Sequence, residues 1–519
     1  MGVIDQLIFQ SATISFNSNI TLILSLSIIF FLFHYFILYP LFFHELAHVP
    51  GPIWCKLSYY YISWYDLKLE RNEKIAEWHR QYGPVICIRP NEVSFSDPEL
   101  MREIYSTMGK YTKSDFFDKF ITYGKRALFS IGPYWEHQHK RMLISQFYSN
   151  TGIYQPVVEE FVRERLAALL SCMDEKFTAG RSTSVNLYPM FNCFSFDNIT
   201  RLLYGPRHCA YTIENDQKVR EILLDMKQTQ IWSPINFSFP WIHGSWILKK
   251  LLGPGYTRSL SAEHELAEWN CQQLTAAKED KDWEKDHTLL RRMRTVNTKD
   301  GKPLNPNYIA SEIFDHLNAA QETVAVSLVY INYHLARCPD WQEKIREELR
   351  SLPVADDQGL PSFKDLNNAP LFGAFVREVH RKNPGASGRA ERYVPTGGKA
   401  YSGIFIPERT RVSASTIALH HDPTAFPDSD VFRPERWLEA KPEQKLIMDR
   451  AYIPFGYGAR ICLGKAFARL ELKLLTAALV LKYRMRPDWE KMTERDMWQT
   501  GTMDSVPCGL KCVLVLERL

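Results

Sequence analysis

A segment of 32 residues without proline or glycine constrains this chain more than any other feature. It runs from Asn307 to Cys338, between Pro306 and Pro339. As one continuous helix it would be roughly 48 Å long, about three times the average in globular proteins. A helix of this length crosses a whole domain, so the sequence predicts a mainly α-helical body built around it. Polar residues at its centre fit either an exposed face or a functional groove, and the motifs below favour the groove.

The remaining sequence predicts further helices and a small β-rich region. Helical patterns cover residues 155–176, 194–203, 216–228 and 259–278, and residues 84–96 and 393–413 have the pattern of short strands. The 63 basic and 59 acidic residues give a net charge of +4, so no nucleic-acid binding is expected. The ten cysteines are scattered and predict reduced thiols, and the pair at Cys508 and Cys512 lacks the neighbours of a zinc site.

The N-terminal segment, residues 1–43, differs from the rest of the chain. Residues 20–43 contain no charged residue and would form a helix of roughly 36 Å, enough to cross a bilayer. A cleaved signal peptide and a buried core helix are the alternatives, but no basic start or cleavage site accompanies the segment. Residues 44–55 form a proline-rich connector, and residues 56–519 form the body of the protein. Lys56, Lys68, Arg71 and Lys74 follow the span, which favours a single-pass topology with a cytosolic body.

The strongest local pattern is the run from Phe455 to Gly464, F-x-x-G-x-R-x-C-x-G, followed by a helical repeat of apolar residues. A cysteine at a helix N-terminus is favoured as a thiolate by the helix dipole and by free N–H groups. Glycines such as Gly456 let the backbone approach a planar cofactor closely. Arg460 can pair with a carboxylate of that cofactor. A lone cysteine before a helix is usually structural, but the complete run predicts a ligand at Cys462.

This run resembles the haem-binding signature of cytochromes P450, and the resemblance extends over nearly the whole chain. It implies a mainly α P450 fold with a small β-rich region and an N-terminal transmembrane helix. It also implies haem b as the cofactor, with Cys462 as the axial ligand of the iron. Phe455 would pack near the sulfur, and Gly456 and Arg460 would contact the haem.

A second resemblance concerns a structural network. Glu378 and Arg381 form an E-x-x-R pair, and Phe432-Arg433-Pro434-Glu435-Arg436-Trp437 resembles the P-E-R-W element of the family. The resemblance implies that Glu378, Arg381 and Arg436 form a buried lock that holds the cysteine loop and does no chemistry.

Further contacts to the haem propionates are implied by two other segments. Arg392 lies in a segment that resembles the propionate-binding segment of the family. Trp135 resembles the tryptophan of W-x-x-x-R, which places the basic residue at His139, or at Lys140 after a shift of one position. The sequence leaves these two alternatives open.

The centre of the long helix, Ala319 to Val324, is similar to the oxygen-activation motif of the family. Glu322 and Thr323 match the acid and the alcohol that deliver protons, and they are the predicted catalytic residues. Ala320 and Val324 depart from the usual glycine and second threonine.

Taken together, the resemblance implies a monooxygenase that inserts one atom of O2 into an apolar small molecule. A secondary metabolite such as a terpenoid or polyketide is the expected substrate. Electrons would come from NADPH through a separate NADPH-cytochrome P450 reductase, with cytochrome b5 as a further candidate, at the endoplasmic reticulum membrane. The alternatives are a reductase-independent isomerase or dehydratase and a non-enzymatic haem-binding membrane protein. The expected substrate walls are residues 116–129, 231–246, 384–389 and 500–506.

Overall fold

The long central helix organises the computed structural model, which describes residues 2, 20–177, 180–501 and 503–519. This helix, α13, spans Pro306–Arg337, so the prediction from the sequence is shifted by one residue. Pro306 lies in the first turn, where a backbone N–H would have no acceptor within the helix. The Asn305 side chain caps the helix by accepting hydrogen bonds from the backbone N–H groups of Asn307 and Tyr308.

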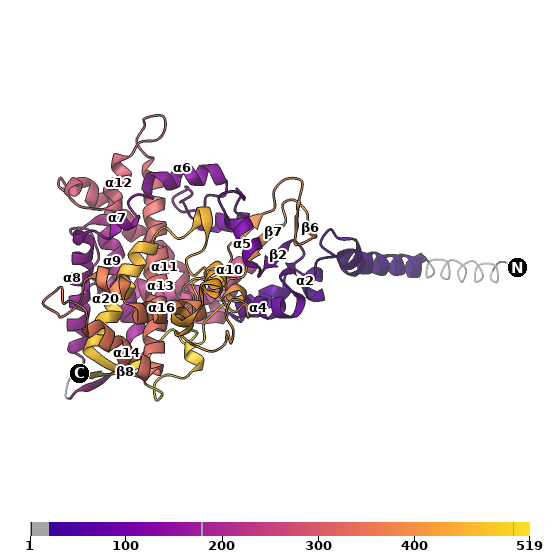
Figure 1. Ribbon diagram of the computed structural model, residues 1–519. Coiled ribbons are helices and arrows are strands. Elements are labelled where there is room, and N and C mark those ends of the chain that lie inside the picture. The colour runs from indigo at the N-terminus through magenta and orange to yellow at the C-terminus, as the bar shows by residue number, and fades with distance from the viewer. Residues whose placement is uncertain (1, 3–19, 178–179, 502) are drawn as a thin grey trace.

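Most of the described chain is helical, as predicted (Figure 1). The α-helices are α2 (Ile53–Leu57), α3 (Tyr61–Leu67), α4 (Arg71–Tyr82), α5 (Pro98–Tyr105), α6 (Tyr134–Ile144), α7 (Asn150–Ile153), α8 (Pro156–Asp174), α9 (Leu187–Tyr204), α10 (Gln217–Ser238), α11 (Trp246–Glu279), α12 (Leu289–Thr295), α13, α14 (Pro339–Arg350), α15 (Phe363–Asn368), α16 (Pro370–Lys382), α17 (Thr416–His420), α18 (Arg436–Glu439), α19 (Pro442–Ala451) and α20 (Lys465–Lys482). Short 3-10 helices are η2 (Asp115–Phe120), η3 (Trp283–Lys285), η4 (Gly458–Arg460) and η5 (Arg495–Met497).

The β structure is small and divided among three sheets. The strands are β1 (Val85–Arg89), β2 (Glu92–Phe95), β3 (Ser182–Asn186), β4 (Arg392–Tyr393), β5 (Lys399–Tyr401), β6 (Ile404–Ile406), β7 (Arg411–Ala414), β8 (Tyr483–Pro487) and β9 (Val513–Arg518). One sheet has the order β1-β2-β7-β4, in which β2 and β7 are parallel and the other pairs antiparallel. A second, antiparallel sheet has the order β3-β9-β8, and β5 and β6 form a hairpin. The two segments predicted as strands lie in the first sheet and the hairpin.

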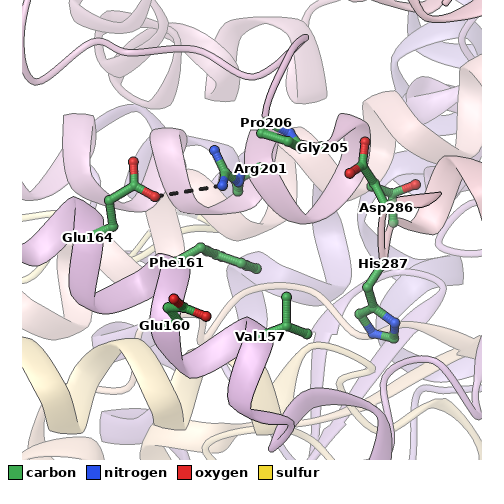
Figure 2. Close-up of a pocket in the computed structure, with 10 residues that line it drawn as sticks. Val157, Glu160, Phe161, Glu164, Arg201, Gly205, Pro206, Asp286 and His287 are labelled. Atoms are coloured by element: carbon green, nitrogen blue, oxygen red, sulfur yellow. Dashed lines mark ion pairs between the residues drawn. The ribbon is translucent and has the colours of Figure 1, made fainter. Parts of the chain in front are cut away.

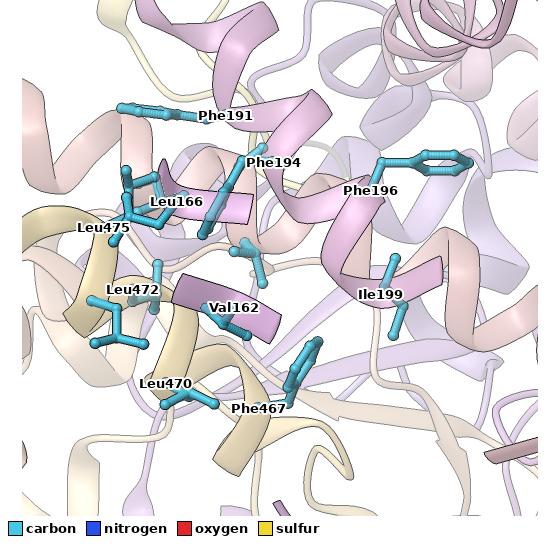
Figure 3. Packing of buried hydrophobic residues seen from close by; sticks show 14 of the residues in the cluster. Val162, Leu166, Phe191, Phe194, Phe196, Ile199, Phe467, Leu470, Leu472 and Leu475 are labelled. Atoms are coloured by element: carbon cyan, nitrogen blue, oxygen red, sulfur yellow. The ribbon is translucent and has the colours of Figure 1, made fainter. Parts of the chain in front are cut away.

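The main hydrophobic core lies between α8, α9, α13 and α20. Figure 3 shows aromatic side chains of α9, including Phe191 and Phe194, beside Val162 of α8 and Leu475 of α20. The four side chains are each less than 1% exposed. Burying them provides the main driving force for folding, at about 1.5–3 kcal/mol for each large apolar side chain. This core fixes α13 and α20, the two helices that carry the predicted chemistry.

The N-terminal span lies apart from this core. Residues Ile20–Phe43 form one apolar helix with a mean hydropathy of 2.3, long enough to cross a membrane. Its last ten residues, η1 (His34–Phe43), have π-helical spacing and include Pro40. Figure 1 shows the helix projecting away from the globular body, and its apolar side chains, such as Ile29 and Phe31, are exposed. An exposed apolar helix of this length is consistent with a membrane anchor and excludes the alternative of a buried core helix.

Candidate functional site

A tight loop before α20 presents the predicted ligand, Cys462. The backbone N–H of Cys462 donates to the Phe455 carbonyl oxygen at 2.9 Å, which closes the loop. Gly458 has a φ of +70°, and a Cβ at this position would overlap the Tyr105 carbonyl oxygen. Only glycine meets both conditions without strain. The spacing of the F-x-x-G-x-R-x-C-x-G run is therefore required by the geometry of the loop.

The thiol of Cys462 is accessible to solvent although protein atoms lie close around its sulfur. Burial raises the pKa of this thiol above its ordinary value. Hydrogen bonds from the backbone of Gly464 and Lys465, and the positive charges of Arg141 and Lys465, act in the opposite direction. These groups stabilise a thiolate as expected for a cysteine at the start of a helix. The Phe455 ring lies edge-on to His380, with 5.7 Å between the ring centroids.

Basic side chains from four separate segments gather near this loop. Arg460 donates to the carbonyl oxygens of Ile131 and Gly132, both at 2.6 Å. Arg392 donates to the carbonyl oxygens of Ala390 and Glu391, and Lys113 to that of Phe129 at 2.5 Å. Helix α6 contributes His137 and Arg141. We call Lys113, His137, Arg141, Arg392 and Arg460 the basic cluster.

The members of the basic cluster repel one another electrostatically. Burial, followed by the charges of Arg460, Lys113, Arg141 and Arg392, lowers the pKa of His137 to about 2. Burial and the charges of Arg392 and Arg141 lower the pKa of Arg460 to about 9. Within the described residues, no member has a carboxylate within ion-pair distance, and His137 Nδ1 has no hydrogen-bond partner. Buried positive charge without a negatively charged neighbour is costly. The cluster therefore has the composition of an anion-binding site.

Helix α6 does not bring the predicted Trp135, His139 and Lys140 to this cluster. Trp135 is 60% exposed, with Lys110 over its ring. His139 is exposed and contacts Lys299 at 2.8 Å, and Lys140 Nζ lies 3.8 Å above the Tyr308 ring.

The residues of α6 that do face the cluster are His137 and Arg141, which sequence reasoning missed. They are four positions apart and therefore share a face of the helix. The two residues of W-x-x-x-R are also four positions apart. Grouping the basic residues of α6 by helix face would therefore have paired His137 with Arg141.

The two predicted catalytic residues lie on different sides of α13. The Thr323 hydroxyl donates to the Ala319 carbonyl oxygen at 2.7 Å, and its side chain is partly accessible. Glu322 is 2% exposed and points toward α9, where Asn192 Nδ2 donates to its carboxylate at 3.2 Å. Adjacent helical residues do not face each other, so the two side chains are neighbours in sequence but have different surroundings.

The structure brings Glu378, Arg381 and Arg436 together. Arg381 donates two hydrogen bonds to the Glu378 carboxylate, at 2.8 and 2.9 Å. Arg436 Nε donates to it at 3.1 Å, the backbone N–H of Arg433 at 2.9 Å and Trp437 Nε1 at 3.0 Å. Arg381 also donates to the carbonyl oxygens of His420 and Ser429. The network thus ties α16 to α18 and to the segment that leads to the cysteine loop.

The four segments predicted as substrate walls meet above α3 and α4. The rings of Phe116 and Phe237 are 5.1 Å apart, and the Arg389 guanidinium lies against both. Met503, from the last segment, lines a cavity of about 10 Å³ together with Phe237 and Arg389. The charge of Arg389, paired with Asp66 at 2.5 Å, adds a polar element to a wall expected to be apolar.

A larger cavity of about 250 Å³ lies elsewhere, between α8, the end of α9 and the segment before α12 (Figure 2). Glu164 and Arg201 form an ion pair of 3.6 Å at its edge. None of the predicted site residues lines it, so it plays no part in the site around Cys462.

The site around Cys462 fits the haem that the motif predicts. The Cys462 thiol would supply a ligand to the haem iron, and the basic cluster would supply donors for two carboxylates. His137 Nδ1, buried and without a partner, is the kind of atom that a propionate would satisfy. Arg392 and Arg460 would hold the propionates with His137, and Cys462 would hold the iron.

Comparisons with known proteins give the same family. The cytochrome P450 family model matches residues 49–508. Cytochrome P450 monooxygenase FGM1 of Gibberella zeae is 40% identical over 474 residues, which cover 91% of this chain and 92% of the relative. Cytochrome P450 monooxygenase pkfB of Emericella nidulans is 29% identical over 88% of this chain and 90% of that protein. The structure of retinoic acid-bound cyanobacterial CYP120A1 has a TM-score of 0.65, with 19% identity over 85% of this chain and 93% of that one, which shows a shared fold.

Proposed function

Because this chain belongs to the cytochrome P450 family and is a P450 monooxygenase, we propose that it inserts one oxygen atom from O2 into an apolar small molecule. A secondary metabolite of the terpenoid or polyketide class is the proposed substrate. One oxygen atom would enter the substrate and the other would leave as water, with two electrons supplied by NADPH through a separate NADPH-cytochrome P450 reductase. The observation that carries the proposal is the accessible thiol of Cys462 beside a basic cluster without carboxylate partners.

When bound, the haem would supply the redox chemistry that activates O2. The role of this chain is to hold and shield that chemistry. Cys462 would hold the haem iron and donate electron density to it through its thiolate. Thr323, whose hydroxyl is partly accessible on α13, holds a proton at the oxygen site, and Glu322 controls proton supply to it. The Phe116 and Phe237 rings exclude water from the proposed substrate wall.

The anchor helix places this domain at the endoplasmic reticulum membrane in the proposal, with residues 56–519 as one catalytic unit facing the cytosol. Lys56 and Lys68 follow the span, as in proteins with positive residues on the cytosolic side. Arg71 does not contribute to this signal because it is buried against Glu92 at 2.8 Å. Protease treatment of sealed microsomes should therefore digest the catalytic domain, and protection would contradict the topology.

The reaction is tested in microsomes that contain the chain, the reductase and NADPH. A panel of terpenoids and polyketides should yield a product heavier by one oxygen atom, and isotopically labelled O2 should supply that atom. Cys462→Ser should abolish both the product and the thiolate-type CO difference spectrum. Turnover without reductase would instead support the isomerase or dehydratase, and an intact CO spectrum without any NADPH-dependent reaction would support a haem-binding protein.

A further inference from the structure

Both oxygens of the Glu322 carboxylate are held by α9. The Tyr188 hydroxyl donates to one oxygen, and Asn192 Nδ2 donates to the other at 3.2 Å. Tyr188, Asn192 and Glu322 are 0%, 1% and 2% exposed. Tyr188 and Asn192 are four positions apart and so lie on one face of α9. The carboxylate of the predicted oxygen-activating acid therefore has two fixed donors and no contact with the Thr323 hydroxyl, which bonds the Ala319 carbonyl oxygen.

A buried lysine from another helix completes this arrangement. Lys227, on α10, is 3% exposed, and its Nζ lies 3.9 Å above the centroid of the Tyr188 ring. Among the described residues Nζ has no hydrogen-bond partner. Burial lowers the pKa of Lys227 to about 8, while the negative charge of Glu322 acts to raise it. A cation over an aromatic ring in a desolvated position is stabilised by the negative face of the ring.

Other ionisable groups surround this unit. Asp504, from the C-terminal segment, accepts from Gln230 of α10 at 2.7 Å, and burial followed by the charge of Glu322 raises its pKa to about 7. Tyr330 of α13 and Cys193 of α9 also face the unit and carry no charge at neutral pH. Lys227 is thus the cation within electrostatic reach of Glu322 from α10.

Three buried polar atoms at this interface lack a partner in the described structure: Asn192 Oδ1, Gln321 Oε1 and Lys227 Nζ. Buried polar groups are normally satisfied by protein or by ordered water. Donors and acceptors of this kind on α9, α10 and α13 suit a short chain of water molecules that ends at Glu322.

We propose that Tyr188 and Asn192 are positioning residues that hold Glu322 against α9, and that Lys227 balances the negative charge of this carboxylate, so that protons reach Thr323 through the interface of α9, α10 and α13. The proposal rests on the proposed monooxygenase function. It extends that function by assigning proton supply to residues on two helices outside the oxygen-activation motif.

The test measures the fraction of consumed O2 that is released as hydrogen peroxide. Full-length protein in microsomes receives reductase, NADPH and farnesol as an apolar terpenoid probe. Oxygen that is not released as peroxide ends in product or water, so the ratio is defined whether or not farnesol is oxidised. Tyr188→Phe should raise the ratio of peroxide to product plus water by about 10-fold to 100-fold, as expected when a reacting group is misplaced. Tyr59→Phe, at an exposed tyrosine, should leave it unchanged.

The charge of Lys227 is tested by the pH profile of the same ratio. Lys227→Met removes the buried cation beside the Glu322 carboxylate, so peroxide release should lose the pH dependence that this cation provides. Lys227→Arg should restore the profile, whereas Lys218→Met, at an exposed position of α10, should not alter it. A merely structural lysine would change protein yield but not the pH profile.

A thermal measurement without turnover complements these results. If Tyr188 and Glu322 interact, the changes in melting temperature caused by Tyr188→Phe and Glu322→Gln should not add in the double variant. Additive shifts, or a peroxide ratio unaffected by Tyr188→Phe, would overturn the proposal. If the wild-type protein has an intact CO spectrum but does not oxidise NADPH, the proposed function is wrong. The melting temperatures of the single and double variants still show in that case whether Tyr188 and Glu322 interact.

Discussion

Replacing Glu378 with alanine should destabilise the whole haem-binding domain. The Glu378 carboxylate is 0% exposed and accepts five hydrogen bonds, two from Arg381 and one each from Arg436, Trp437 and the backbone of Arg433. Arg381 is also 0% exposed, so its charge would remain buried without its counter-ion. The expected cost is about 3–5 kcal/mol, and the two neutral donors left without an acceptor act in the same direction.

This cost is large compared with a total stability of about 5–15 kcal/mol. In a domain of several hundred residues, the entropy of unfolding is on the order of 1 kcal/mol per kelvin, so the melting temperature should fall by roughly 3–5 °C. Because the network supports the segment before the cysteine loop, the haem content per purified chain should fall as well. Thermal unfolding followed by circular dichroism, together with the CO difference spectrum, measures both effects.

Glu439→Ala provides the matched control. Glu439 pairs with Arg433 at 3.1 Å, in the same region of the chain, but both side chains are largely exposed. Surface ion pairs of this kind contribute less than about 1 kcal/mol. Equal melting temperatures and equal haem contents in Glu378→Ala and Glu439→Ala would refute the assignment of a buried lock.

Thr323→Ala should retain haem and substrate binding but lower product formed per NADPH about 10²–10⁴-fold, with peroxide released instead. Thr323→Ser should recover most of the product. An unchanged ratio of product to NADPH in Thr323→Ala would remove Thr323 from catalysis. His137→Leu should speed haem transfer to apomyoglobin about 10-fold to 100-fold, as expected for a lost charge-assisted hydrogen bond of about 1.5–3 kcal/mol. His139→Leu should leave the transfer rate unchanged. Faster transfer from His139→Leu than from His137→Leu would favour the contact predicted from the sequence. Burial lowers the pKa of His420 to about 3, and its Nε2 accepts from the Ile453 N–H at 2.9 Å. Since the unfolded chain then binds more protons between pH 6.5 and about 3, stability should decline as the pH drops through this window, by up to about 1.4 kcal/mol per pH unit from this residue. His420→Gln should flatten that decline in urea unfolding series, and an unaltered slope would contradict the contribution.

Local sequence patterns were enough to predict several parts of this molecule. The absence of proline and glycine between Pro306 and Pro339 predicted α13, because helix propagation needs no distant contacts once no residue interrupts it. The uncharged run of residues 20–43 predicted the exposed apolar helix for a similar reason. The cysteine loop could be predicted because position 458 requires glycine. The backbone there has a positive φ and lies close to the Tyr105 carbonyl oxygen.

The surroundings of the catalytic residues depended on tertiary structure. Lys113, His137 and Arg460 come from segments far apart in the chain, and only packing brings their charges together. The rotation of α6 decides that His137 faces inward, whereas the motif spacing had offered only His139 or Lys140. Glu322 and Thr323 are adjacent in sequence, yet α13 packs against α9 so that the Glu322 carboxylate accepts hydrogen bonds from Tyr188 and Asn192. The sequence by itself therefore determined the helices, the apolar N-terminal helix and the loop that presents Cys462, because these follow from neighbours along the chain. The tertiary structure decided which polar groups meet, because burial and helix rotation depend on contacts between distant segments.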